Sequence, residues 1–178
     1  MSVLTLYKYP NPILRVPGRP LDIEGGELAL PSAQRLIDDM IETMYAGPGA
    51  IGLAAPQIGQ SVRIVVLDMA ARFYSKPLEE QPPSELKVLV NPTVLEASRN
   101  KVMREGCLSF PDYLASIKRA TKVTYQACDR DGVLQTYTVR DLEAIAVQHE
   151  IDHLDGILMI DRVASLKTDW IRRTNQRS

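Results

Sequence analysis

Residues 141–156 read DLEAIAVQHEIDHLDG and contain both histidines of the chain. His149 and His153 are four residues apart, and Glu150 follows the first of them directly. Because residues i and i+4 share one face of a helix, both imidazoles can reach one cation. Apolar residues precede His149 on more than one face of the predicted helix, which favours burial. The stretch therefore predicts a metal-binding helix in the interior of the protein.

The HExxH pattern places Glu150 to act on a water held by the metal rather than to bind the metal. A catalytic metal usually has three protein ligands, and the chain contains no third histidine. Cys107 is the candidate, because Gly106 before it would let the backbone approach the metal closely. A thiolate with two imidazoles suits a borderline metal such as Zn²⁺ or Fe²⁺. We therefore predict a site made of Cys107 and the two histidines.

Composition narrows the class of protein. The chain has 178 residues, of which 45% are hydrophobic and 24% charged, and its net charge is -1. These values fit one domain over residues 1–178 and give no signal for a nucleic-acid or membrane partner. The two cysteines, Cys107 and Cys128, form no disulfide framework, and residues 1–10 lack a signal-peptide pattern. A cytoplasmic location is therefore expected.

Four regions outside the metal helix carry local signals. Prolines make residues 1–30 an expected extended, turn-rich arm. Residues 32–45 have the apolar stripe of an amphipathic helix, with Ser32 as its expected N-cap. Residues 164–178 are expected to form a C-terminal helix or tail that begins near Ser165. Its basic residues are interpreted as a solvated helix end rather than a binding surface: Lys167, Arg172, Arg173 and Arg177.

Several runs have the composition of β-strands, at residues 63–68, 86–91, 101–104, 122–128 and 133–139. Asp131-Gly132 between the last two runs predicts a tight hairpin turn. A helix over residues 142–155 follows, with Asp141 as its expected cap and Gly156 as its stop. The expected fold is therefore α+β, with mainly antiparallel strands packed around a central buried helix that carries the HExxH motif.

Three short motifs in this chain together resemble those of peptide deformylases. They occur in the same order as in that family, at residues 50–57 (AIGLAAPQ), 105–109 (EGCLS) and 148–153 (QHEIDH). The resemblance extends from about Leu6 to Val163. One departure is Ala50, which stands where the family's first motif has its leading glycine, although Gly49 precedes it.

This resemblance implies a metal-dependent hydrolase that removes the N-formyl group from the N-terminal methionine of newly synthesised proteins and releases formate. The implied partners are N-formylmethionyl nascent polypeptides, which the enzyme would bind at the ribosome. The implied cofactor is one divalent metal ion, Fe²⁺ in the cell, with Zn²⁺, Ni²⁺ or Co²⁺ in purified protein.

The resemblance also assigns roles to residues. Glu150 would carry the proton, while the Gln57 amide and the Leu108 backbone N–H would stabilise the oxyanion. Glu105 and Arg119 match a pair that braces the cysteine loop. The implied substrate-binding residues are Ile51, Gly52, Gly106, Leu142, Ile145 and Ala146. Plain core packing is the alternative interpretation of the four apolar side chains in this set.

A metalloprotease is the alternative enzyme. The chain continues from His153 to Gly156 like a metzincin signature, but Met159 stands where that signature needs a third histidine. A protease with a downstream glutamate ligand stays open, although it leaves the segment around Cys107 unexplained. Activity on formylated rather than ordinary peptides distinguishes a deformylase from a metalloprotease.

A structural zinc site is the alternative that is not an enzyme. Cys107, Cys128 and the two histidines would form a closed Cys₂His₂ set. Such a site has no use for Glu150, and Cys128 falls inside a strand pattern where a buried thiol is ordinary. X-ray absorption decides between the two kinds of site, because two sulfur ligands and no water would favour the structural one.

Overall fold

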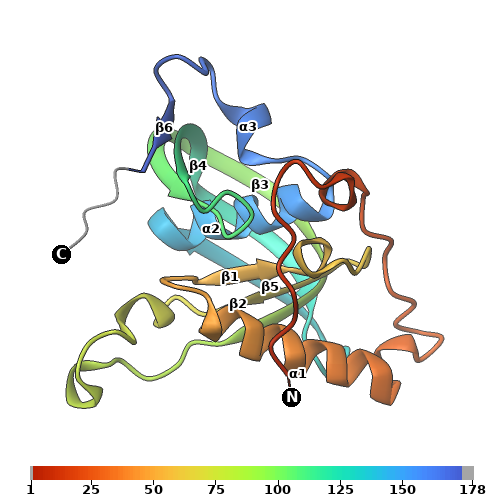
Figure 1. The fold of residues 1–178 in the computed structure, drawn as a ribbon. Helices are drawn as coiled ribbons and strands as arrows, with labels where there is room; N and C mark the ends of the chain where they lie inside the picture. Colours follow the sequence, from red (N-terminus) through yellow and green to blue (C-terminus); the bar gives the residue numbers. More distant parts are fainter. Residues whose placement is uncertain (1, 174–178) are drawn as a thin grey trace.

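The computed structural model describes residues 2–173 (Figure 1). Its main feature is an antiparallel sheet in the order β1-β2-β3-β4-β5, with β6 paired to β4. The strands are β1 (Gly52–Ala54), β2 (Ile64–Leu67), β3 (Lys87–Gly106), β4 (Tyr113–Cys128), β5 (Leu134–Arg140) and β6 (Trp170–Arg172). The helices are α1 (Pro31–Ala46), α2 (Asp141–Leu154) and α3 (Met159–Arg162). The predicted α+β class with antiparallel strands is confirmed.

Helix α2 is buried against the sheet, as predicted (Figure 1), and contacts β1, β2, β4 and β5. Its start differs from the prediction, because Arg140 holds the N-cap position and Asp141 is the first helical residue. Its end agrees, since Gly156 follows the helix with a left-handed φ of 71°. A Cβ at this position would lie 2.6 Å from the carbonyl oxygen of Arg15, so the close approach of the N-terminal arm requires glycine.

Helix α1 packs on the opposite side of the sheet from α2, and the alternation of strand β2 shows this arrangement. Val65 and Leu67 belong to the α2 cluster, whereas Ile64 and Val66 pack with Met40 of α1. Every residue of β2 is buried, as expected for a strand covered on both faces. The predicted helix is therefore confirmed, but its predicted cap is wrong. The N-cap position is held by a leucine, Leu30, and the helix begins with Pro31, a residue whose missing N–H costs nothing in the first turn.

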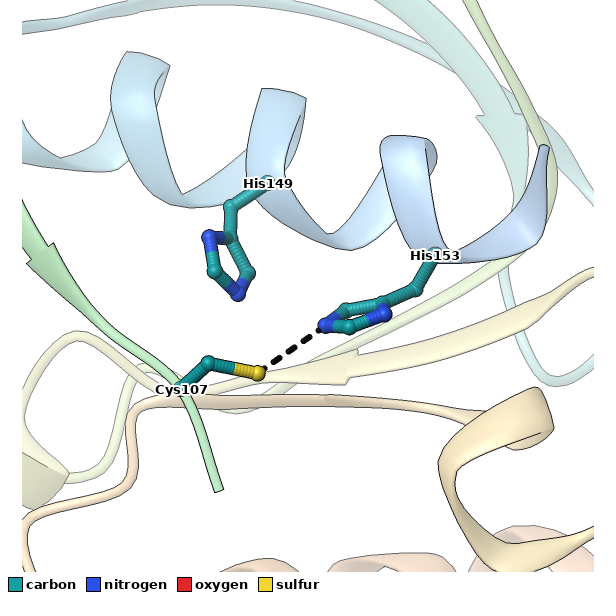
Figure 2. A group of neighbouring side chains, drawn as sticks. All are labelled: Cys107, His149 and His153. Atoms are coloured by element: carbon teal, nitrogen blue, oxygen red, sulfur yellow. Dashed lines mark hydrogen bonds between the residues drawn. The ribbon is translucent and has the colours of Figure 1, made fainter. Parts of the chain in front are cut away.

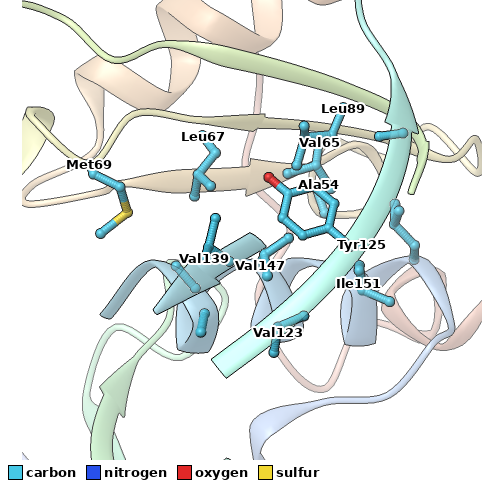
Figure 3. Packing of buried hydrophobic residues seen from close by; sticks show 14 of the residues in the cluster. Ala54, Val65, Leu67, Met69, Leu89, Val123, Tyr125, Val139, Val147 and Ile151 are labelled. Atoms are coloured by element: carbon cyan, nitrogen blue, oxygen red, sulfur yellow. The ribbon is translucent and has the colours of Figure 1, made fainter. Parts of the chain in front are cut away.

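The core between α2 and the sheet is centred on a fully buried tyrosine, Tyr125 of β4 (Figure 3). The Tyr125 ring stacks on Tyr137 of β5 with centroids 5.1 Å apart. Val147 and Ile151 supply the α2 side of this cluster. Packing against both strands fixes where the metal helix lies.

Strands β3 and β4 are longer than the sequence patterns indicated. The runs predicted at residues 86–91 and 101–104 belong to the single strand β3, which pairs with β4 from Val90 to Gly106 with bulges on the way. The predicted hairpin between β4 and β5 is present. Its connection is the whole of residues 129–133, wider than the tight turn expected from Asp131-Gly132.

The N-terminal end of the described chain has the expected structure, and the C-terminal end does not. Residues 2–30 form the expected arm, which contains the short 3₁₀ turns Pro12–Arg15 and Glu27–Ala29 and an isolated bridge from Arg19 to Val62. The predicted C-terminal helix is wrong over the described residues, because turns at 166–169 lead into strand β6. Arg177 and the rest of residues 174–178 lie outside the described part. None of the helices in residues 2–173 has the length and apolar character that crossing a membrane requires.

Candidate metal centre

The three predicted metal ligands come together in the structure (Figure 2). Cys107 directly follows strand β3, and His149 and His153 project toward it from α2. Their candidate ligand atoms all lie within 4.8 Å of one another, and Cys107 Sγ is 3.2 Å from His153 Nε2. One sulfur and two imidazole nitrogens are a donor set that suits a borderline divalent ion. The residues present therefore fit the metal implied by the sequence.

The predicted alternative of a closed Cys₂His₂ zinc site is wrong. Within residues 2–173, the metal-capable group contains Cys107, His149 and His153 but not Cys128. Cys128 ends strand β4 and packs beside the α1 core instead. Three protein ligands leave a coordination position open, which is typical of catalytic rather than structural sites.

The electrostatics of the site favour the thiolate form of Cys107. Burial by itself raises the pKa of the thiol, but His153 and His149 beside it outweigh burial and hold that pKa well below its usual range. The Ser109 backbone N–H also donates to Cys107 Sγ, at 3.4 Å. The thiolate is the form that binds a metal, so the surroundings prepare this ligand before the ion arrives.

A chain of buried ion pairs orients His149. Its Nδ1 lies 2.8 Å from Glu105 Oε2, and Glu105 accepts two hydrogen bonds from Arg119 at 2.8 and 3.0 Å. Arg119 also donates to Asp152, which is held in turn by Arg162 of α3. The Nδ1 contact leaves His149 Nε2 to face the metal, the arrangement that typically fixes a ligating imidazole. The Glu105–Arg119 pair was predicted, whereas Asp152 and Arg162 were not.

Glu150 lies in the wall of the site with a free carboxylate oxygen. Its Oε2 is buried and has no hydrogen-bond partner among the described residues. Burial raises the pKa of Glu150, although the neighbouring His149 and His153 pull it down. Gly52 of β1 lies against this side chain, where an added Cβ would be 2.5 Å from Glu150 Oε1. Gly52 therefore makes the room in which this carboxylate lies.

Gln57 is held rigidly beside the cysteine. Its Oε1 accepts from the Ala54 backbone N–H at 3.0 Å, which directs the amide nitrogen toward the site. That nitrogen donates to Ser109 Oγ at 3.2 Å and approaches Cys107 Sγ at 3.5 Å. Within the first motif, strand β1 and the 3₁₀ turn Ala55–Ile58 position Gln57.

A cavity of about 530 Å³ opens onto Cys107, His149 and Glu150. The other sequence-predicted residues that line it are Gln57, Leu108, Ile51, Gly52, Gly106, Leu142, Ile145 and Ala146. His153 lies behind this surface and does not line it. Ala50 also lines the cavity, and Gly49 before it has a left-handed φ of 66°, a conformation that favours glycine.

Three basic residues on the cavity wall were not predicted: Lys8, Arg104 and Arg173. Arg173 belongs to the basic tail that was interpreted as a solvated helix end. Its position depends on strand β6 pairing with β4, a contact between distant segments that has no local sequence signal. The cluster of basic residues was the available hint.

Comparison with known sequences relates nearly the whole chain to one family. The family model described as polypeptide deformylase matches residues 3–169. A peptide deformylase of Mesorhizobium japonicum is 42% identical over 172 residues, which cover 96% of this chain and 90% of the relative. One from Desulfotalea psychrophila is 40% identical over 173 residues, covering 97% and 95%.

Solved structures agree with the sequence matches. A peptide deformylase from Legionella pneumophila superposes with a TM-score of 0.81 at 36% identity, over 93% of this chain and 89% of that one. A class I type b peptide deformylase from Acinetobacter baumannii with bound Met-Ala-Ser gives 0.80 at 32% identity, over 92% and 100%. The chain, with its Cys-His-His metal site, belongs to the polypeptide deformylase family.

Proposed function

We propose a role for each residue of this site in the reaction that the chain catalyses, the removal of the formyl group from an N-terminal methionine. One observation carries the proposal: the Glu150 carboxylate, with one buried and unpartnered oxygen, lines the same cavity as Cys107 and His149 of the Cys-His-His donor set. Such a carboxylate can move protons without also having to bind the metal. The reaction is the hydrolysis of an amide, with formate and a free amine as products.

Cys107, His149 and His153 would hold one divalent ion. When bound, the ion supplies positive charge that polarises the formyl carbonyl and makes water a better nucleophile near neutral pH. We assign Fe²⁺ as the ion in the cell, by resemblance to the family, with Zn²⁺, Ni²⁺ or Co²⁺ in purified protein. A thiolate–imidazole set binds several of these ions, so their availability decides which is present.

Glu150 acts as the proton carrier. Its unpartnered oxygen accepts a proton from the attacking water and then passes it to the nitrogen of the leaving amine. Its buried oxygen has no competing hydrogen-bond partner among the described residues, which suits a group that must both take and give a proton. Gly52 keeps the space that this movement needs.

Gln57 and Leu108 stabilise the negative charge that develops on the formyl oxygen. The Gln57 amide nitrogen already points into the site, because Ala54 fixes the other end of the amide. The Leu108 backbone N–H follows directly after the cysteine ligand. Donors that are in place before the reaction stabilise an oxyanion without further reorganisation.

The methionine side chain occupies the apolar part of the cavity. Ile51, Leu142, Ile145 and Ala146 line this part, and Gly52 and Gly106 line the cavity beside them. A tight pocket next to the metal ligands would admit the small formyl group and exclude larger acyl groups. The Acinetobacter baumannii relative binds Met-Ala-Ser, a peptide that begins with methionine, as this proposal requires of a substrate site.

The natural substrates are N-formylmethionyl nascent polypeptides, which the enzyme binds at the ribosome in the cytoplasm. The whole of residues 1–178 serves as one catalytic domain. Recognition through main-chain hydrogen bonds beyond the methionine would let the enzyme accept many nascent sequences.

Formate release from formyl-Met-Ala-Ser tests the proposal. The protein is loaded with Fe²⁺ under anaerobic conditions and assayed with the formylated peptide and with longer peptides that lack the formyl group. We expect formate from the first and no internal cleavage of the second. Cleavage of ordinary peptide bonds without formate release would favour the metalloprotease alternative.

A further inference from the structure

Three exposed basic side chains line the opening of the catalytic cavity. Lys8 belongs to the N-terminal arm, Arg104 lies near the end of strand β3, and Arg173 directly follows strand β6. They come from three distant parts of a chain whose net charge is -1. Their convergence on one cavity therefore does not follow from a basic protein surface in general. We call these three residues the cationic rim.

The cationic rim lacks an acidic counterpart. The acidic residues that line the same cavity are Glu105 and Glu150, and both are buried. Glu105 is already paired with Arg119 and His149. Within residues 2–173, no ion pair joins a carboxylate to any member of the rim. The rim therefore presents unneutralised positive charge to whatever enters the cavity.

Arg173 is held close to the reacting end of the cavity. Its backbone N–H donates to the Asp112 carbonyl at 2.8 Å, and its Nε approaches the Tyr113 carbonyl at 3.4 Å. The guanidinium lies over Gly106, where an added Cβ would be 2.5 Å from Nη2. Gly106 is the residue before the ligand Cys107, so Arg173 is placed beside the early residues of a bound peptide.

We propose that the cationic rim makes the enzyme prefer formylated substrates with an acidic side chain at the second or third position. The inference rests on the proposed function, in which formyl-methionine occupies the cavity and the rest of the peptide leaves through its opening. An extended chain advances about 3.3 Å per residue and turns alternate side chains to opposite sides. The two residues after methionine therefore pass the rim, and one of them faces it.

A matched peptide series tests the preference. The peptides are formyl-Met pentapeptides with an amidated C-terminus, which removes the terminal carboxylate as a competing anion. Aspartate, lysine or alanine stands at the second or at the third position. At low salt we expect kcat/KM for one aspartate peptide to exceed that of its lysine counterpart by about 3- to 10-fold, the range of a few exposed ion pairs. The difference should lie mainly in KM.

High salt and charge-changing variants test whether the cationic rim causes the preference for acidic peptides. At about 1 M salt, where the Debye length is about 3 Å, the preference should largely disappear. Lys8→Gln, Arg104→Gln and Arg173→Gln combined should bring the aspartate-to-lysine ratio close to one. The corresponding three glutamate substitutions should invert the ratio.

A control variant removes the same charge elsewhere. Arg35→Gln, Lys122→Gln and Lys167→Gln combined also change the net charge by three, and none of these residues lines the cavity. This variant should keep the wild-type preference. A preference absent from wild type at both positions, or lost equally in both triple variants, would overturn the inference. Turnover of the alanine peptide keeps that result distinct from failure of the proposed function, which would abolish formate release from every peptide.

Discussion

The two faces of helix α2 are stabilised by different kinds of interaction. One face carries His149 and His153, and buried ion pairs and hydrogen bonds surround it. The other face carries Val147 and Ile151, which pack into the apolar core around Tyr125 (Figure 3). Packing fixes the position of the helix, whereas polar contacts fix the orientation of each ligand. Substitutions on the polar face should therefore change metal binding and turnover, and those on the apolar face should change stability.

The largest effect is expected for loss of a metal ligand. Cys107→Ser removes the thiolate ligand. We expect metal affinity to fall by more than the 10- to 100-fold that is typical when a residue hydrogen-bonded to a ligand is changed. Metal content and affinity, measured by titration with a chelator, check this prediction. Cys128→Ser is the matched control and should bind metal normally. Equal loss in both variants would contradict the assignment of the ligands.

Removing the proton carrier should come next. Glu150→Gln keeps the shape of the side chain but cannot accept a proton, so turnover should fall by about 10²–10⁴-fold, the usual size of acid–base catalysis. The metal should remain bound, because this carboxylate is not a ligand. Formate release is measured on protein with verified metal content. Wild-type turnover in the fully loaded variant would rule out the role given to Glu150.

A smaller effect is expected one contact further from the metal. Glu105→Gln weakens the hold on His149 and leaves Arg119 with less negative charge beside it. We expect metal affinity to fall by about 10- to 100-fold, as is typical when a partner of a ligating histidine changes. Glu143→Gln is the matched control. It makes the same substitution on α2, where Glu143 pairs with Lys87 away from the metal site, and it should leave metal affinity unchanged. Unchanged affinity in the Glu105 variant would mean that packing alone orients His149.

The polar face was largely predictable from sequence, because its chemistry demands particular residues at short spacings. His149, Glu150 and His153 fit one turn of helix, and the need for a third ligand pointed to Cys107. The resemblance supplied Gln57 from its own short motif. The roles of Asp152 and Arg162 were not predictable, since their ion pair depends on how α3 returns to α2.

Two features that the sequence analysis missed, strand β6 and the position of Arg173, depend on contacts between distant segments. Strand β6 forms because a three-residue segment meets the edge of β4, and the local sequence did not indicate it. Placement of Arg173 at the cavity follows from that pairing. The cap of α1 was misjudged for a local reason, because Pro31 starts a helix as well as a side-chain cap at Ser32 would.

The smallest effect is expected at the centre of the apolar face. The Tyr125 hydroxyl is buried and has no hydrogen-bond partner among the described residues, so it lowers stability where it stands. Tyr125→Phe removes it and should leave the free energy of unfolding unchanged or raise it by up to about 1 kcal/mol. Denaturant unfolding measures this free energy. The control is Tyr137→Phe, which removes the hydroxyl from the half-buried ring that stacks on Tyr125. Its free energy of unfolding should lie within about 0.5 kcal/mol of wild type. Deformylation should not change. A loss of stability above about 1 kcal/mol would reveal a buried water bound to the hydroxyl, and the core would then depend on polar contacts as the metal face does.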